Sequence, residues 1–256
     1  MTHYKNLIVN VRDDVLWLRI NRPQSKNALS GATLSELREA CAAGAAIASL
    51  KAMVVTGEGS ESFAAGGDLK EFAAIRSVEA TDQLWETGSG ALDGIRNFPV
   101  PVVAAVNGWA LGGGAELAVA CDYRVAARHA AIGFIHARLN ITCGFGGGAD
   151  LMRLLGHSRA LRHALGAKAL SAAEAHALGL VDEVAAEDEA LEDCVTRFLE
   201  PMLRHKPQVI RAYKRMAVAQ REGAPLQARR AIEKECFRDT WMHDDHWSAV
   251  DQMTRR

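Results

Sequence analysis

Apolar residues recur along this chain at two different spacings. Five short apolar runs predict strands, at residues 7–11, 15–20, 52–56, 100–106 and 123–126. Helical spacing predicts a helix through Leu34, Leu37, Cys41 and Ala45, and residues 84–95 also favour a helix. Thr33 and Glu36 resemble a capping box that would begin the first of these helices. The order of strands and helices predicts an α/β core with its sheets covered on both faces.

The pattern becomes mainly helical beyond Gly144. Helices are expected at 150–155 and 158–165, then one opened by Ser171 and Glu174, followed by a last strand at 180–184. From Leu191 the chain reads as helix almost to its end, with breaks expected at Pro201, Pro207 and Pro225. We therefore divide the chain into a core, 1–190, and a helical C-terminal region, 191–256. Its aromatic residues favour an oligomerisation layer, with an intramolecular cover as the alternative.

Two glycine-rich segments are the candidates for chemistry. Gly112, Gly113 and Gly114 run directly into a predicted helix that carries Glu116. Backbone N–H groups at a glycine-rich helix start can approach a developing anion, although such glycines also serve phosphate binding or close packing. Glu116 itself could be a solvated first-turn glutamate. The small-residue turn at 63–71 follows an apolar run and supplies a second set of accessible N–H groups.

Composition and charge remove several classes of function. Lys and Arg total 30 against 31 for Asp and Glu, so the net charge of -1 gives no support to nucleic-acid binding. The five cysteines form no CxxC pair, which indicates neither a disulfide framework nor a zinc site, so no metal is expected. The N-terminus has no signal-peptide pattern and no apolar run is long enough to span a membrane. A cytoplasmic protein is the default expectation.

Taken together and in order, the motifs resemble those of the crotonase, or enoyl-CoA hydratase/isomerase, superfamily over nearly the whole chain. The matching segments are Arg22-Pro23 with Asn27-Ala28-Leu29, 63–69, 101–116, 171–175 and 179–182. The resemblance implies a spiral of ββα units, with a C-terminal helical region that assembles trimers, commonly stacked as hexamers. It also implies an acyl-CoA thioester substrate and no separate cofactor, since coenzyme A is part of the substrate.

The same resemblance implies roles for individual residues. The N–H groups of Gly67 and Gly113 would form an oxyanion hole for the thioester oxygen, which gains charge as an enolate forms. Glu116 would be a catalytic acid or base. Seven residues would lie along the substrate and its coenzyme A: Lys26, Ala28, Ala64, Gly66, Asp68, Leu69 and Trp109. For Lys26 a solvated charge is the alternative, and for Trp109 simple packing is.

The chain departs from the family where hydratases carry a second glutamate, because His136 stands there. His136 could be a hydrogen-bonding spacer, could share proton transfer with Glu116, or could suit the carboxylate of a malonyl-type substrate that loses CO₂. Phe134-Ile135-His136 and the loop from Gly144 to Gly147 are locally similar to the ethylmalonyl-CoA decarboxylase branch. Hydration, isomerisation and decarboxylation of ethylmalonyl- or methylmalonyl-CoA stay open at this stage.

Two further alternatives concern the role of Cys143 and whether the protein is an enzyme at all. Cys143 stands where the family usually has proline, and it is either a small hydrophobic residue or a reactive thiol. A non-catalytic protein that binds acyl-CoA, or RNA, is the competing class of function. The balanced charge weighs against RNA, and Glu116 beside both glycine segments weighs against a dead enzyme.

Overall fold

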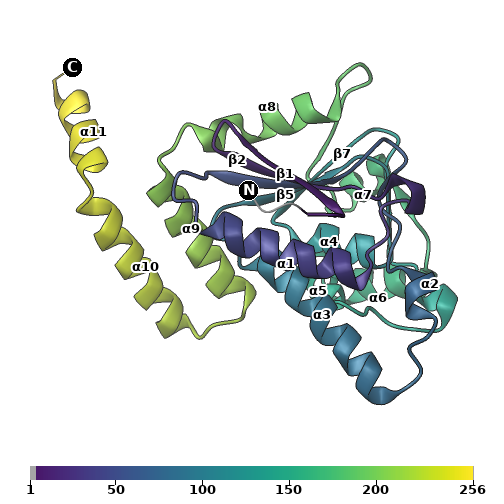
Figure 1. Ribbon diagram of the computed structural model, residues 1–256. Coiled ribbons are helices and arrows are strands. Elements are labelled where there is room, and N and C mark those ends of the chain that lie inside the picture. The colour runs from purple at the N-terminus through teal and green to yellow at the C-terminus, as the bar shows by residue number, and fades with distance from the viewer. Residues whose placement is uncertain (1–3, 256) are drawn as a thin grey trace.

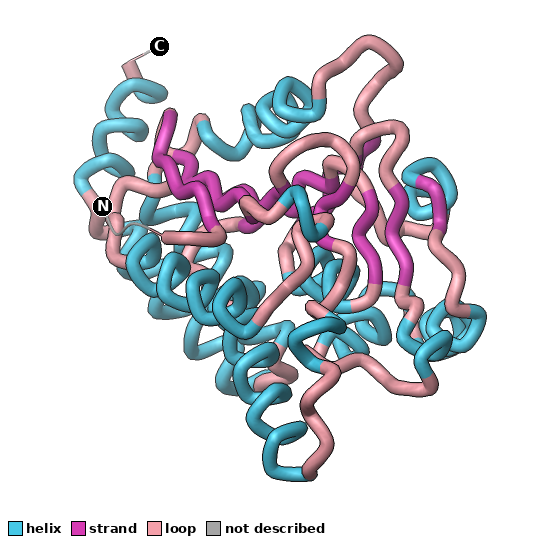
Figure 2. The backbone as a smooth tube through the Cα atoms, turned by 45° about the vertical axis from the view of Figure 1, so that its right-hand side comes forward, coloured by secondary structure: helices cyan, strands magenta, loops and turns pink. Residues whose placement is uncertain are grey.

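A computed structural model describes residues 4–255, which form two sheets (Figures 1 and 2). The larger sheet has the strand order β1-β2-β3-β5-β7-β10: β1 (Leu7–Arg12), β2 (Val15–Ile20), β3 (Ala52–Gly57), β5 (Val102–Val106), β7 (Tyr123–Ala126) and β10 (Glu183–Val184). The first two strands form an antiparallel hairpin and the other pairs are parallel. The smaller sheet contains β4 (Ser62–Ala64), β6 (Trp109–Leu111), β8 (Ala131–Gly133) and β9 (Leu170–Ser171).

Strand pairs alternate between the two sheets as the chain advances. In each of the pairs β3/β4, β5/β6 and β7/β8, the first strand joins the larger sheet and the second joins the smaller one. The helix α3 (Val78–Arg96) follows the first pair after the short α2 (Leu69–Phe72), and α4 (Gly113–Ala120) follows the second. This repeated turn of strand, strand and helix confirms the α/β spiral expected from the sequence.

Helices cover both faces of the larger sheet, which explains why its strands read as continuous apolar runs. Met53 and Val55 face the main core together with residues of α1 (Gly31–Ala45) and α3. Ala52 and Val54, one position away in each case, face a second core that α8 (Leu191–Leu203) completes. The side-chain period of two in a strand therefore divides one apolar segment between two cores.

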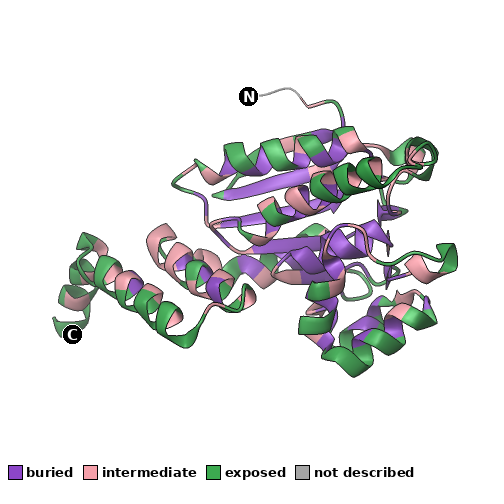
Figure 3. Cartoon of the chain, turned by 90° about the horizontal axis from the view of Figure 1, so that it is seen from below, coloured by how far each residue is buried: buried purple, intermediate pink, exposed green. Residues whose placement is uncertain are grey.

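The remaining helices lie below and beside the sheets. They are α5 (Gly147–Leu155), α6 (His157–Gly166), α7 (Ala172–Ala177), α9 (Pro207–Arg221), α10 (Leu226–Trp241) and α11 (Asp244–Thr254), with the 3-10 turns η1 (Pro23–Ser25) and η2 (His136–Leu139). Lys214 and Arg221 of α9 both pair with Asp122, which anchors α9 to the body. The helices α10 and α11 extend away from it (Figures 1 and 3). None of the described helices is long and apolar enough to cross a membrane.

The first capping-box prediction is wrong and the second is confirmed. The helix α1 begins at Gly31, and its cap is Ser30, whose Oγ accepts a hydrogen bond from the Thr33 N–H at 3.2 Å. Glu36 instead accepts a bond from the Asn6 N–H at 2.8 Å, so it ties the N-terminal segment to α1. Ser171 and Glu174 do form a reciprocal capping box at the start of α7.

Other boundaries also differ from the expectation. Pro201 does not break a helix but lies inside α8, near its end, whereas Pro207 and Pro225 stand at the starts of α9 and α10 as expected. The strand expected at 180–184 is only Glu183–Val184. Leu180 lies before β10, where it is buried and its carbonyl accepts a bond from the Arg124 guanidinium.

A contact between small residues sets the position of α4. A Cβ atom on Gly114 would overlap the carbonyl of Ala64, so α4 can approach β4 this closely only with glycine there. The N-terminal end of α4 is thereby held against the 63–67 turn. Both glycine-rich segments of the sequence meet at this contact.

We expect Gly114→Ala to lower the melting temperature by roughly 3–10 °C, because the added methyl group must push α4 away from β4. Gly166→Ala is the matched control, since a Cβ there meets nothing within 4 Å and Gly166 ends a helix. That variant should melt at or above the wild-type temperature in a calorimetric scan. Equal losses in the two variants would contradict the packing argument.

Candidate active site

Glu116 is buried in the first turns of α4, and its carboxylate is fully hydrogen-bonded. Its Oε1 accepts from the Gly144 N–H at 3.0 Å and lies 3.0 Å from Nε2 of His136. Its Oε2 accepts from the N–H groups of Phe145 and Gly147, each at 2.9 Å. The alternative of a solvated first-turn glutamate is therefore wrong for this side chain.

The loop from Gly144 to Gly147 closes over this carboxylate. A Cβ atom on Gly147 would come within 2.5 Å of the Glu116 Cβ atom, so the loop can approach only through a glycine. Gly146 adopts a positive φ of 83°, which turns the chain into α5. The sequence indicated this glycine loop as a family motif but gave no reason to expect that its N–H groups bind Glu116.

The N–H groups of Gly67 and Gly113 lie close together. The Leu29 N–H donates to the Gly66 carbonyl and the Asp68 N–H donates to the Leu29 carbonyl, so the Gly67 N–H points away from this bridge. Gly113 is the first residue of α4, where an N–H has no partner within the helix. An ideal Cβ on Gly113 would lie 3.4 Å from the Gly67 nitrogen. Among the described backbone hydrogen bonds neither of these N–H groups has an acceptor, so two neighbouring donors are available near Glu116, as an oxyanion hole would require.

The Phe145 ring fills the space between three glycines. A Cβ on Gly113 would lie 2.6 Å from this ring and one on Gly67 would lie 3.9 Å from it. A Cβ on Gly88 of α3 would overlap the ring outright. Phe145 is buried, so it excludes water from one side of the two N–H groups. Gly88 was not expected from the sequence, because only the fold brings it to residue 145.

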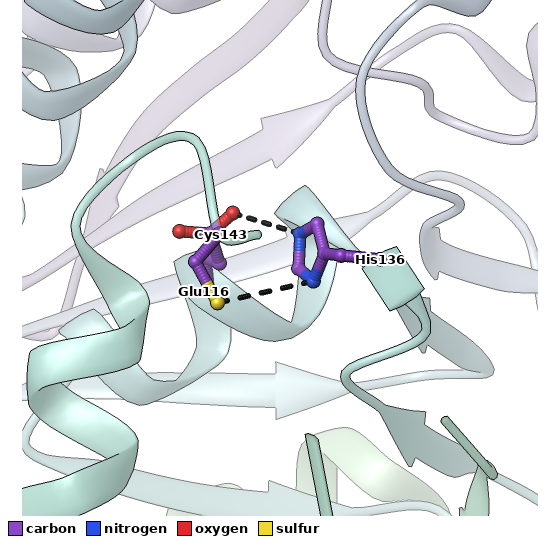
Figure 4. A group of neighbouring side chains, drawn as sticks. All are labelled: Glu116, His136 and Cys143. Atoms are coloured by element: carbon purple, nitrogen blue, oxygen red, sulfur yellow. Dashed lines mark hydrogen bonds and ion pairs between the residues drawn. The ribbon is translucent and has the colours of Figure 1, made fainter. Parts of the chain in front are cut away.

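His136 connects Glu116 to Cys143 (Figure 4). The second imidazole nitrogen, Nδ1, lies 3.9 Å from the Cys143 sulfur. Burial, together with the nearby charge of Glu116, raises the pKa of the Cys143 thiol to about 12, so the thiol is protonated at neutral pH. An S–H group directed at Nδ1 and a carboxylate at Nε2 favour the tautomer with its proton on Nε2. These three residues also bring ligand-type atoms within 4.8 Å of one another.

An apolar cavity of about 480 Å³ opens beside His136. It is lined mainly by aliphatic and aromatic side chains from α3, η2, α5 and α6, namely Trp85, Phe134, His136, Ala137, Ile141, Thr142, Cys143, Gly146, Gly148, Ala149, Leu151, Met152, Leu161, Ala164 and Leu165. Among the described residues, those lining the cavity include no Asp, Glu, Lys or Arg. The sequence did not identify this cavity, because its walls come from four separate elements.

The segments that hold the expected coenzyme A residues run side by side. The Ala65 N–H donates to the Lys26 carbonyl, and Leu29 pairs with the next turn as described above. This arrangement brings Lys26 and Ala28 next to the segment that contains the buried Ala64 and Gly66. The sequence therefore indicated two segments that do meet in space.

Individual side chains in this group have other partners. Lys26 is exposed and pairs with Glu61 at 2.8 Å, so it has a solvated ion pair in addition to any substrate contact. Asp68 caps α2 and pairs with Arg22 at 2.9 Å, and the hydrogen bond from Arg22 holds the pKa of Asp68 below its usual value. Leu69 and Trp109 both expose large apolar surfaces. Trp109 projects from β6 rather than packing in the core.

Sequence comparison decides the family. Residues 10–254 match the family described as enoyl-CoA hydratase/isomerase. This chain belongs to the enoyl-CoA hydratase/isomerase family. It is an enzyme of the enoyl-CoA hydratase type that acts on acyl-CoA thioesters, as its motifs implied.

Relatives with known names support the same assignment. The chain is 37% identical over 235 residues to the 2,3-dehydroadipyl-CoA hydratase of Escherichia coli, covering 90% of this chain and 88% of the relative. It is 38% identical over 190 residues to the crotonyl-CoA hydratase of Syntrophomonas wolfei, covering 74% and 73%. A crystal structure of enoyl-CoA hydratase from Bacillus anthracis superposes with a TM-score of 0.90 at 30% identity, over 98% and 96% of the two chains. These relatives lend no support to the decarboxylase branch.

Proposed function

We propose that this enzyme hydrates 2-enoyl-CoA thioesters with Glu116 as its general base and His136 as the group that positions the water. The observation that carries the proposal is the 3.0 Å contact between His136 Nε2 and Glu116 Oε1, beside the N–H groups of Gly67 and Gly113. One carboxylate, one neutral donor and two convergent N–H groups supply the functions that hydration needs.

The hydrogen bonds of Glu116 indicate where the water binds. A carboxylate has about four acceptor positions, and four donors occupy those of Glu116. Three of these donors are backbone N–H groups of one loop, whereas the fourth is a side chain that can rotate. A water molecule that displaces His136 from Oε1 would donate to Glu116 and accept from the Nε2–H group. Its remaining lone pair would then be free to attack the substrate.

The reaction then balances without a second carboxylate. The water oxygen forms a bond to C3 of the enoyl group, while its proton passes to Glu116 and the C2–C3 π electrons move onto the thioester oxygen. The Gly67 and Gly113 N–H groups stabilise the resulting enolate oxygen. Glu116 returns the proton to C2 as the enolate collapses. His136 keeps its Nε2 proton throughout, which agrees with its position between a carboxylate and a thiol S–H group.

We further propose an uncharged, aliphatic acyl group. The cavity beside His136 has the size of a small-ligand pocket, and its described lining contains no Asp, Glu, Lys or Arg. A terminal carboxylate on the acyl group would lose its hydration there without gaining a cation. The E. coli relative, by its name, acts on an acyl group that ends in a carboxylate. The two enzymes would therefore differ in acyl preference.

The nucleotide end of coenzyme A is proposed to lie along the paired segments of Lys26–Ala28 and Ala64–Leu69. Lys26 is exposed at the rim, so it can exchange Glu61 for a phosphate group. Leu69 and Trp109 offer exposed apolar surface to the pantetheine or adenine parts. This placement leaves the thioester at the two glycines and the acyl group in the apolar cavity.

The assembly is proposed to be a trimer or a dimer of trimers that the C-terminal helices hold together. Both α10 and α11 extend from the body and are largely exposed (Figure 3). Their large exposed apolar residues include Phe237, Trp241, Trp247 and Met253. The Trp241 ring also contacts those of Phe237 and Trp247, with centroids 5.2 and 5.8 Å away, respectively. A continuous aromatic surface of this kind is typical of an interface between chains.

We expect Glu116→Gln to reduce kcat for crotonyl-CoA hydration by about 10²–10⁴-fold with little change in binding of butyryl-CoA, because the base is lost while the N–H donors stay. His136→Gln keeps an N–H donor, so its kcat should fall by about 10-fold. His136→Leu has no donor, so its kcat should fall by at least about 10²-fold, the smallest loss expected for Glu116→Gln. Hydration is followed by loss of absorbance of the enoyl thioester. The proposal would be wrong if the enzyme released CO₂ from ethylmalonyl-CoA, or shifted a double bond, faster than it hydrated crotonyl-CoA.

The acyl preference can be tested by comparing kcat/KM for 2-hexenoyl-CoA and 2,3-dehydroadipyl-CoA, which have acyl chains of equal length. The uncharged substrate should be favoured by about 100-fold or more, because burying an unpaired carboxylate costs several kcal/mol. Met152→Arg adds a cation at the cavity wall and should narrow the ratio, whereas Met152→Leu is the size-matched control. A preference of the wild type for the dicarboxylic substrate would refute the proposed acyl class.

The assembly can be tested by light scattering coupled to size exclusion. The wild type should elute as three or six chains, and the double variant Trp241→Glu, Trp247→Glu should elute as smaller species because charges then replace the aromatic contact. Val78→Glu on α3 is the control for added charge at an exposed apolar position outside the C-terminal helical region. A monomeric wild type would contradict the proposed assembly.

A further inference from the structure

The side chains around His136 form a set of three different metal-ligand types. Glu116 offers a carboxylate oxygen from α4, His136 an imidazole nitrogen from η2, and Cys143 a sulfur from the loop before α5. One such atom from each residue lies within 4.8 Å of the other two, and all three side chains face one another (Figure 4). The proposed hydration uses Glu116 and His136, whereas Cys143 takes no part in its bond-making and proton-transfer steps.

We propose that Glu116, His136 and Cys143 form a Zn²⁺ site that inhibits the enzyme by occupying its base and its water-binding group. Zinc accepts oxygen, nitrogen and sulfur ligands, and catalytic zinc sites commonly use three protein ligands with a fourth position open. Such a set excludes Mg²⁺ and Ca²⁺ as the preferred ions, because both favour oxygen ligands alone.

The ligand atoms can reach the spacing of a zinc site when the His136 and Cys143 side chains rotate. Bonds of about 2.0 Å to nitrogen and oxygen and 2.3 Å to sulfur place tetrahedral ligand atoms about 3.3–3.6 Å apart. The Glu116 Oε1 and His136 Nε2 atoms are 3.0 Å apart, so they need to separate only slightly. The Cys143 sulfur lies 3.9 Å from Nδ1, the other imidazole nitrogen. It must therefore turn toward Nε2, the nitrogen that Glu116 already contacts.

The backbone N–H groups that bind the Glu116 carboxylate would also hold it in place as a metal ligand. Zinc would replace the Nε2–H group as the partner of Oε1, and the neutral imidazole would then carry its proton on Nδ1. The N–H groups of Gly144, Phe145 and Gly147 would keep their bonds to the same carboxylate. Backbone donors that orient a ligating carboxylate stiffen a metal site. Only the side chains of His136 and Cys143 would have to move when the ion binds.

Charge and access are also favourable. The thiol loses its proton to solvent as the Zn–S bond forms, so a thiolate, a carboxylate and a neutral imidazole balance the charge of the ion. Arg96 contacts this loop through the Phe145 carbonyl, but Asp93 and Asp150 match its charge. His136 and Cys143 both line the 480 Å³ cavity, so neither side chain is sealed inside the core.

Binding of the metal is tested without turnover. Isothermal titration of the full chain with ZnCl₂, after removal of metals by a chelator, should show one tight site per chain. Cys143→Ala and His136→Gln should each weaken this site by about 100-fold or more. Cys41→Ala is the matched control, because Cys41 is buried in the main core away from the cavity, and it should leave the affinity unchanged.

Two further readouts identify the ligands and the mechanism of inhibition. Co²⁺ in place of Zn²⁺ should give a sulfur-to-metal charge-transfer band in the wild type and in Cys41→Ala, and none in Cys143→Ala. Saturating butyryl-CoA should weaken Zn²⁺ binding at least 10-fold. Equal Zn²⁺ affinity in the wild type and Cys143→Ala, or a cobalt complex without the sulfur band, would overturn the site. Because hydration is assayed separately in chelator, its failure would be distinguishable from failure of the metal site.

Discussion

The buried carboxylate of Glu116 is stable only because donors surround it on every side. An ionised carboxylate without partners costs several kcal/mol in a protein interior, so burial of Glu116 requires the Gly144–Gly147 loop to close over α4. That closure in turn requires glycine at position 147, where any side chain would strike Glu116 itself. It also carries Phe145 into its place between α3 and α4. One electrostatic requirement therefore fixes the loop, the start of α5 and one wall of the proposed oxyanion hole.

The glycines of this site, which have no side chain, shape it as much as the larger residues do. The Phe145 ring occupies volume that Gly88 and Gly113 leave empty, and α4 reaches β4 because Gly114 has no Cβ to meet Ala64. Close-packed interiors transmit such constraints, since a single methyl group must displace a whole element. The two N–H groups of Gly67 and Gly113 are therefore placed by packing around them and not by flexible loops. Preorganised donors of this kind need no rearrangement as charge develops.

Local sequence predicted those features whose cause is local. Strands of the larger sheet were readable because both of their faces are buried, which leaves an uninterrupted apolar run such as 52–57. The smaller sheet escaped prediction because its strands are two or three residues long, too short for any periodicity. Thr33 and Glu36 fit a capping pattern, but Ser30 offered a cap three residues earlier and Glu36 found the Asn6 N–H instead. Motifs indicated Glu116 and His136, while their contact depends on a fold that brings residues twenty positions apart together.

His136 and Cys143 differ from the usual family residues, and in the structure they lie beside each other next to Glu116. His136 bonds to the carboxylate and faces Cys143, whose thiol can supply the proton that a neutral imidazole lacks at Nδ1. Restoring glutamate at position 136 alone would place two carboxylates about 3 Å apart in an apolar cavity, where both cannot stay ionised. A proline at position 143 would at the same time remove the only side chain that His136 Nδ1 contacts among the described hydrogen bonds. The two departures are therefore better understood as one coupled solution to holding a single buried charge than as two independent losses of a family motif.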